Sequence, residues 1–130
     1  MRRVEICTKK RTEFVDITSV VDDEVSGSGI REGVCILHCP HTTAGLTINE
    51  HADPSVATDM LNALDRLIPE DGPWMHREGN APAHLKASWM GACVHVPICE
   101  GKIALGRWQG VFLCEFDGPR ARELWLRFMA

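Results

Sequence analysis

A buried strand gives way to a polar segment in the stretch VCILHCPHTTAGLTINE, residues 34–50, and this transition decides the fold. The first six residues are apolar at nearly every position, which predicts a strand covered on both faces. Pro40 ends that strand, and His41 with two threonine hydroxyls follows at once. Irregular backbone at the end of a buried strand often presents chemistry, because it can aim polar groups at a ligand. We therefore expect a functional site to begin at His41.

The segments before this stretch predict two short strands and a helix. The β-type runs lie at residues 4–8 and 12–17, with a charged turn between them. Thr18 or Ser19 can then cap a helix that ends at the glycine-containing segment 27–29.

The segments after it predict two helices and then more strands. Asp53 is a capping carboxylate and Pro54 suits the first helical position, so a helix is expected to start there. Its apolar stripe has spacings of four, four and three: Val56, Met60, Leu64 and Leu67. A shorter helix is expected from Pro82 to Gly91. Alternating residues then predict strands at 94–98, 103–107, 111–116 and 122–129. Residues 1–130 thus predict a single compact α+β domain, with mainly antiparallel sheets in layers and two to three helices.

Composition limits the classes of function. The chain has 130 residues, 45% hydrophobic and 25% charged, which is typical of a soluble globular domain. A formal charge of −4 argues against a nucleic-acid partner, and no apolar run approaches the roughly 20 residues of a membrane span. The first residues lack the apolar region of a secretory signal, so a cytoplasmic location is expected. The six cysteines include no Cys-x-x-Cys pair, which favours buried thiols over a zinc–thiolate site.

Three histidines are candidate metal ligands. His41, His76 and His84 each lie in a predicted loop or at a predicted helix start. Imidazole suits zinc, copper, iron or nickel, and Glu50 or Asp53 could complete a ligand set. Their spacing matches neither His-x-x-x-His nor His-Glu-x-x-His, so spacing alone does not place them on one face.

An anion site is an alternative for the same region. A helix that starts near Pro82 directs free N–H groups and its positive dipole end out of the preceding loop. Lys86, Ser88 and Asn80 lie in or beside its first turns, and Arg120 follows a turn later in the chain. A solvent-facing capped helix explains this pattern equally well. Serine-hydrolase, P-loop and dinucleotide fingerprints are absent.

The last predicted strand has a mixed face that suits a subunit interface. Trp125 and Met129 share this face with Glu123 and Arg127. Tryptophan, methionine and arginine are enriched in interfaces between proteins. Trp125 could equally well cover the sheet within one chain.

An ordered set of motifs resembles the YjbQ family, often described as secondary thiamine-phosphate synthase. The motifs occur at the family's separations from about residue 34 to residue 122. They are HTTAGLTINE (41–50), DP (53–54), EGN (78–80), AHLKAS (83–88), Gly106 with WQG (108–110), and EFDGPR (115–120). His51 departs from the family, which more usually has asparagine at this position.

The resemblance implies a layered α+β homotrimer with a site built from His41, His76 and His84. It implies a divalent metal there, zinc or similar, or a bound anion. The resemblance also implies five catalytic candidates: His41, His84, Glu50, Lys86 and Arg120. It places further candidates on the rim or in support of the site: Asn49, Asp53, Asn80, Ser88, Trp108 and Gln109.

The family's reported reaction joins an aminopyrimidine diphosphate to a thiazole phosphate and releases pyrophosphate. Such a reaction needs charge neutralisation on the diphosphate, by Mg²⁺, Lys86 or Arg120. It also needs a pocket for two aromatic rings, for which Trp108 or Trp74 are candidates. The expected partner is thus a small phosphorylated metabolite. The alternative is a non-catalytic trimeric protein that holds a metal or a small anionic metabolite.

Overall fold

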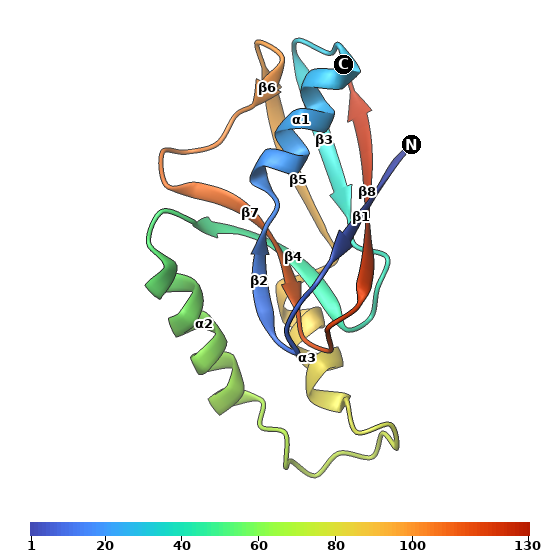
Figure 1. Cartoon of the computed structure of the whole chain (residues 1–130), viewed down its shortest axis with the longest axis vertical. Coiled ribbons are helices and arrows are strands. Elements are labelled where there is room, and N and C mark those ends of the chain that lie inside the picture. Colours follow the sequence, from blue (N-terminus) through green and yellow to red (C-terminus); the bar gives the residue numbers. More distant parts are fainter.

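The computed structural model describes all residues 1–130 as eight strands and three helices (Figure 1). The strands are β1 (Arg2–Cys7), β2 (Glu13–Asp16), β3 (Gly33–His38), β4 (Ala44–Glu50), β5 (Cys93–Cys99), β6 (Lys102–Ile103), β7 (Gln109–Glu115) and β8 (Ala121–Met129). The helices are α1 (Thr18–Ser28), α2 (Pro54–Leu67) and α3 (Ala81–Met90).

Two antiparallel sheets form the layers of the domain. The larger has the order β1-β8-β3-β5-β6 and the smaller the order β2-β7-β4. Every strand pair is antiparallel. In Figure 1, α1 lies in front of the larger sheet, α2 stands to one side of the smaller sheet, and α3 lies towards the lower end. The prediction of a single α+β domain with layered antiparallel sheets is confirmed.

The main core lies between the two sheets and α1. Leu37 and Leu126 of the larger sheet meet Leu46 and Leu113 of the smaller one, together with Val21 of α1, and none of them is exposed. A second cluster lies on the other face of the smaller sheet, where Phe112, Cys114 and Phe116 pack with residues of α2 and α3. The strand covered on both faces is therefore β7. The prediction gave this position to β3, whose outer-facing residues stay partly exposed or exposed.

Strand β4 was not expected from the sequence, because Gly45 and the threonines around it suggested a loop. A Cβ at Gly45 would lie 2.8 Å from the carbonyl oxygen of Gly91 and 3.0 Å from Cβ of Met90. The glycine thus allows the end of α3 to pack directly on the strand. Its role here is close approach of two backbones, not flexibility.

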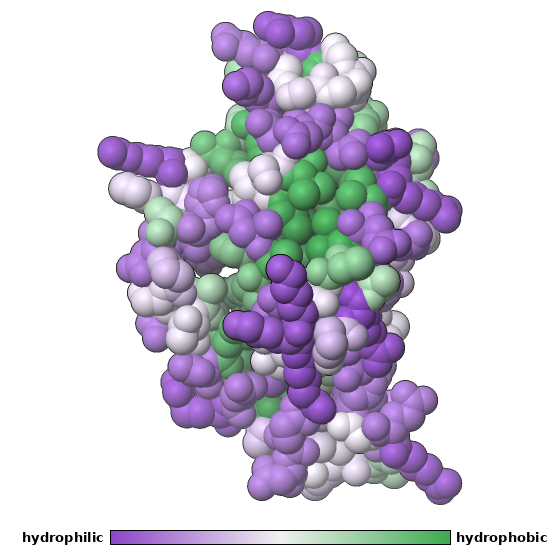
Figure 2. Space-filling model, in the orientation of Figure 1, coloured by the Kyte–Doolittle hydropathy of each residue, from purple (hydrophilic) through white to green (hydrophobic).

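Helix α2 starts as predicted but is only partly covered. Asp53 accepts a hydrogen bond from the backbone N–H of Ser55 at 3.0 Å, and Pro54 follows at the first helical position. Of the predicted stripe, only Leu64 is fully buried, whereas Leu67 is 65% exposed. No helix is long and apolar enough to cross a membrane. The face seen in Figure 2 is largely polar, with an apolar patch beside α1.

A buried ion pair joins the two sheets. Glu115 of β7 and Arg122 of β8 are 0% and 4% exposed. The carboxylate accepts hydrogen bonds from Arg122 Nε at 2.8 Å, from Arg122 Nη2 and from Thr8 Oγ1 at 2.7 Å. It also accepts the N–H groups of Phe116 and Asp117 at 3.0 and 3.1 Å. Burial alone would raise the pKa of Glu115, but hydrogen bonds from Arg122, Thr8 and the N–H of Asp117, with the charge of Arg122, hold it below its usual value. The pair stays charged in the core.

We predict that Arg122→Met destabilises the fold by about 3–5 kcal/mol, because it leaves the Glu115 carboxylate buried without its partner. The double variant Glu115→Gln/Arg122→Met should lose less than the two single variants together. Urea denaturation measures both free energies of unfolding. Arg66→Met is the control, since Arg66 is exposed on α2, outside both sheets; a loss as large in the control would contradict the role of the pair.

Candidate functional site

Three segments converge on one polar site: the loop after β3, the first turns of α3 and the turn before β8. One cavity of about 330 Å³ is lined by Pro40, His41, Thr42, Thr43, Glu78, Asn80, His84, Asp117, Arg120 and Arg122. An adjoining cavity of about 440 Å³ is lined by His41, Thr42, Ala44, His84, Ala87, Ser88, Gly91 and Ala92. Both cavities share His41, Thr42 and His84. We call these two cavities together the histidine cavity.

His41 is held by a backbone group of β8. Its Nε2 accepts a hydrogen bond from the N–H of Glu123 at 2.9 Å. Burial, and next the neighbouring Arg122 guanidinium, lowers the pKa of His41 below its usual value. A ring whose Nε2 is an acceptor is neutral and carries its proton on Nδ1.

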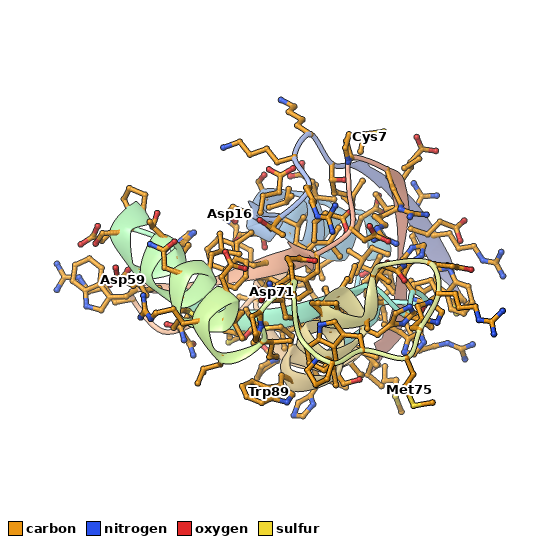
Figure 3. All side chains as sticks on the ribbon, turned by 90° about the horizontal axis from the view of Figure 1, so that it is seen from below. Cys7, Asp16, Asp59, Asp71, Met75 and Trp89 are labelled. Carbon is orange, nitrogen blue, oxygen red and sulfur yellow. The ribbon has the colours of Figure 1, made fainter.

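His76 and His84 contact each other, and His84 lines the same cavity as His41. The His76 and His84 rings meet edge to face with centroids 5.2 Å apart. His76 Nε2 also lies 3.6 Å from a carboxylate oxygen of Glu78. His76 belongs to the loop between α2 and α3, which Figure 3 shows from below with Met75 labelled at its outer edge. Met75 is 95% exposed, so this loop has little cover from the rest of the chain.

Asn80, Asp117 and Arg120 form a polar wall of the cavity. Asp117 Oδ2 accepts from Asn80 Nδ2 and from Arg120 Nη2, both at 2.9 Å. Arg120 Nε donates to the carbonyl oxygen of Asp117 at 2.7 Å, so Nη1 has no partner within the protein. Asn80 Oδ1 is buried and has no hydrogen-bond partner. Asn80 occupies the N-cap position of α3 without a side-chain capping bond, and the second residue of the helix is Pro82, which has no N–H to donate.

The divalent metal stays a prediction, and the residues as they lie do not fit a three-histidine site. No three His, Cys, Asp or Glu side chains are arranged to hold a metal ion. His41 uses Nε2 to accept the Glu123 N–H, so that lone pair is occupied. His76 does not line the histidine cavity.

Lys86 lies outside the histidine cavity, whereas Ser88 lines it. Lys86 Nζ donates to Asp65 Oδ1 of α2 at 2.5 Å, and its side chain is only 2% exposed. Because residues two apart on a helix point to nearly opposite sides, Lys86 and His84 face away from each other. In the single chain Lys86 therefore ties α3 to α2.

Four further candidates lie at the other end of β4. The strand has seven residues, so its ends are about 20 Å apart. Asn49 and Glu50 accept backbone N–H groups of their own turn, at 2.7 and 3.0 Å. Gln109 Oε1 accepts the N–H of Gly106 at 2.8 Å, and Trp108 is 54% exposed with Arg107 stacked on its ring.

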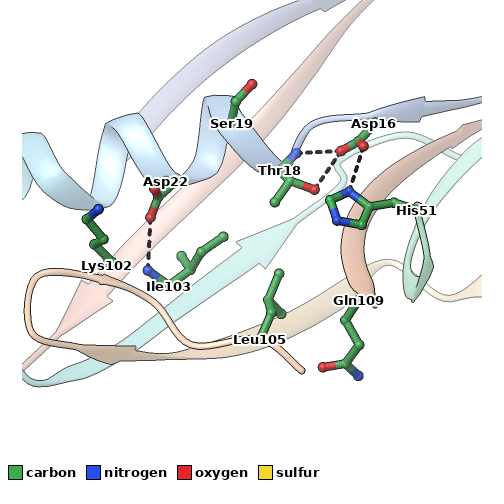
Figure 4. A pocket seen from close by; sticks show the side chains of 9 residues that line it. All are labelled: Asp16, Thr18, Ser19, Asp22, His51, Lys102, Ile103, Leu105 and Gln109. Atoms are coloured by element: carbon green, nitrogen blue, oxygen red, sulfur yellow. Dashed lines mark hydrogen bonds and ion pairs between the residues drawn. The ribbon is translucent and has the colours of Figure 1, made fainter. Parts of the chain in front are cut away.

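A separate cavity of about 610 Å³ lies at that end (Figure 4). His51 Nδ1 lies 2.9 Å from Asp16 Oδ2, and Asp16 Oδ1 accepts from the N–H and hydroxyl of Thr18. A Cβ at Gly110 would lie 2.5 Å from the His51 ring, so only glycine leaves room for it. Asp16 and Thr18 are not among the predicted site residues, because both belong to segments without a recognised motif.

We predict that the pKa of His41 lies below that of the same residue in the unfolded chain, about 6.5. The unfolded chain then binds more protons, so the neutral ring favours the folded state above about pH 6.5. That contribution is lost as the pH falls through the folded-state pKa. NMR titration of the ring Cε1–H, assigned with His41→Asn and repeated in concentrated urea, measures both midpoints. Equal midpoints would contradict the assigned environment.

Sequence comparisons agree with the motif pattern. The family described as "UPF0047 protein YjbQ-like" matches residues 2–130. A UPF0047 protein of Methanocaldococcus jannaschii is 46% identical over 127 residues, covering 98% of this chain and 92% of the relative. The UPF0047 protein YugU of Bacillus subtilis is 46% identical over 130 residues, covering 99% and 98%.

Solved structures show the same fold. A conserved, uncharacterized YjbQ/UPF0047 protein of Clostridium acetobutylicum superposes with a TM-score of 0.97 at 44% identity, covering 99% of this chain and 100% of that one. A conserved hypothetical protein of Thermus thermophilus gives a TM-score of 0.93 at 45% identity, with coverage of 99% and 100%.

Proposed function

The chain belongs to the YjbQ family of UPF0047 proteins, and on that premise we propose that it is an enzyme acting on a small phosphorylated metabolite in the histidine cavity. The observation that carries the proposal is the lining of the smaller cavity. Apart from Pro40, every side chain there is polar, and donors from three segments meet at the start of α3. Such a lining favours a charged ligand over an apolar one.

The donors suit a phosphate group. Arg120 Nη1 has no partner within the protein, and Thr42 and His41 line the same cavity. The N-terminus of a helix contributes a positive dipole end, which favours anions. Of the two carboxylates that line the cavity, Glu78 and Asp117, Asp117 is already paired with Arg120.

The same residues support a division of roles. His84 lies in both parts of the cavity and its ring has no hydrogen bond within the protein, so we assign it proton transfer to or from the substrate. Arg120 would neutralise charge that develops on a leaving phosphate. Mg²⁺ that accompanies a diphosphate is usually bound by one or two carboxylates besides the phosphates. Glu78, which lies 3.6 Å from His76, is the carboxylate of the cavity that is not paired with Arg120.

Thiamine-phosphate synthesis is the narrower form of the proposal. It needs two aromatic rings held beside the diphosphate, but Trp108 and Trp74 do not line the histidine cavity of the single chain. Trp74 Nε1 donates to the carbonyl oxygen of Pro69 within its own loop. The phosphate chemistry therefore has more support than the named reaction.

We predict that the purified protein with Mg²⁺ converts the aminopyrimidine diphosphate and thiazole phosphate into thiamine phosphate, or releases phosphate or pyrophosphate from another small phosphorylated metabolite. His84→Ala should lower kcat roughly 100-fold or more, because a positioned acid or base is lost. Chromatography of the products measures the formation of thiamine phosphate, and a phosphate-release assay measures the reaction with other metabolites.

The matched control is His51→Ala, which removes an imidazole from the other end of β4. No thiamine phosphate above the level of His84→Ala would exclude the named reaction. Tight binding of a phosphorylated compound without turnover would favour the non-catalytic alternative. Neither turnover nor binding across the panel would exclude the phosphate proposal altogether.

We also propose a homotrimer that uses the outer face of the larger sheet. Val34 and Ile36 of β3 are apolar but only partly buried on this face. The sequence pattern predicted that this strand would be covered on both faces. Trp125 lies between Arg3, 4.9 Å from its ring centroid, and His38, 5.7 Å from it. No helix covers this group. A neighbouring copy would bury these side chains.

If this face is the interface, Trp125→Ala should weaken the assembly by about 2 kcal/mol or more per subunit, because an aromatic anchor is removed. Light scattering with dilution should show a wild-type trimer and partial dissociation of the variant. Trp108→Ala, which removes an exposed tryptophan elsewhere, should stay assembled. A monomeric wild type would exclude the trimer, and an undiminished Trp125→Ala trimer would exclude this face.

A further inference from the structure

We propose that His41 serves the histidine cavity as a neutral hydrogen-bond donor, presenting Nδ1–H to an oxyanion of the ligand, and not as a metal ligand or a base. The inference rests on the proposed function in one respect, namely that the ligand carries a phosphate-like oxyanion. The assignment of the ring itself rests on the protein alone.

The end of a strand pair fixes the ring. β3 and β8 pair in register as far as His38 opposite Trp125. Continuing that register would place Pro40 opposite Glu123, but the chain turns away at Pro40 and the N–H of Glu123 loses its strand partner. A strand N–H directed at the neighbouring strand needs an acceptor there. His41 Nε2 replaces the missing carbonyl at 2.9 Å and completes the pair.

The loop that carries the ring is held from a second side. Arg122 Nη2 donates to Thr43 Oγ1 at 2.8 Å, and the N–H of Phe116 donates to the Thr43 carbonyl oxygen at 3.2 Å. Arg122 is itself fixed by Glu115. The segment around His41 is thus anchored to both sheets, so the Glu123 hydrogen bond is not a chance contact of a mobile side chain.

The tautomer of His41 decides which kind of ligand the ring can bind. With Nε2 accepting an N–H, the neutral ring carries its single proton on Nδ1, the nitrogen for which the protein supplies no partner. Binding a metal at Nδ1 while keeping the Glu123 hydrogen bond would require an imidazolate. An N–H donor instead suits an oxyanion, and neutral imidazole can stabilise developing negative charge in this way. Burial and the nearby Arg122 also lower the pKa of His41, which keeps the ring neutral.

His41→Asn and His41→Asp have nearly the same shape but distinguish the role of an oxyanion donor from that of a metal ligand. His41→Asn keeps an N–H donor close to the position of Nδ1 but is a poor metal ligand. His41→Asp offers only oxygen acceptors, which repel an anion but can bind a metal. Titration calorimetry of each purified protein with inorganic pyrophosphate, and of each metal-free protein with Zn²⁺, compares them directly.

We expect pyrophosphate to bind His41→Asn nearly as tightly as wild type and His41→Asp roughly 10- to 100-fold more weakly, the range for a lost hydrogen bond to a charged group. Zinc affinity should be the same in all three proteins. The opposite order, with zinc retained by His41→Asp and lost in His41→Asn, would overturn the proposal. Thermal melting identifies a variant that fails to fold, in which case the NMR measurement on the wild-type ring decides the proposal.

Long-range ¹H–¹⁵N NMR on the ligand-free protein tests the ring separately. At mildly alkaline pH, we expect the His41 proton on Nδ1 and a bare, hydrogen-bonded Nε2. A proton on Nε2 would overturn this inference and leave the phosphate proposal intact. The expected tautomer without any pyrophosphate binding to wild type would overturn the donor role, while the panel of phosphorylated metabolites decides the proposed function separately.

Discussion

The buried Glu115–Arg122 ion pair is the interaction on which the rest of the structure depends. It joins the smaller sheet to the larger one at the point where β7 turns into β8. The Glu115 carboxylate accepts hydrogen bonds from Arg122, from Thr8 and from two backbone amides, so its charge is fully compensated. Neither member is tolerated in the core without the other. Because Arg122 also binds Thr43, the same pair holds the loop that presents His41.

Most of the fold follows from local patterns, and the exceptions have physical causes. Asp53 caps α2 as its position next to proline predicts, and Gly29 ends α1 in the left-handed conformation. β4 was missed because Gly45 is typical of loops, while its reason, contact with the end of α3, is a tertiary one. An apolar run in the sequence also does not show which strand is covered on both faces. Residues of α2 and α3 cover the outer face of β7, whereas no helix covers the outer face of β3.

The sequence predicted the candidate site correctly only for residues whose loops and helix ends lie at the same end of the fold. His41, His84, Asn80, Ser88 and Arg120 line the histidine cavity, as the motifs around their loops and the start of α3 suggested. Lys86 stands in the same motif as His84 but faces α2, because helical geometry separates neighbours in the sequence. Glu50 and Gln109 are in motifs too, yet the length of β4 keeps them away from His41. A sequence motif shows which residues occur together along the chain. It does not show whether their side chains lie close together in the folded chain.

His41 combines a structural and a chemical role, and each limits the other. Its Nε2 completes the pairing of β8 where Pro40 ends β3, so the imidazole replaces a backbone acceptor. Alanine at this position would remove a ligand contact and also leave the Glu123 N–H without its partner, so its effect would mix stability with binding. The structural bond also fixes the tautomer, and thereby the group that the cavity offers to a ligand. A residue chosen only as an acceptor or only as a donor could not do both, whereas neutral imidazole has one nitrogen of each kind.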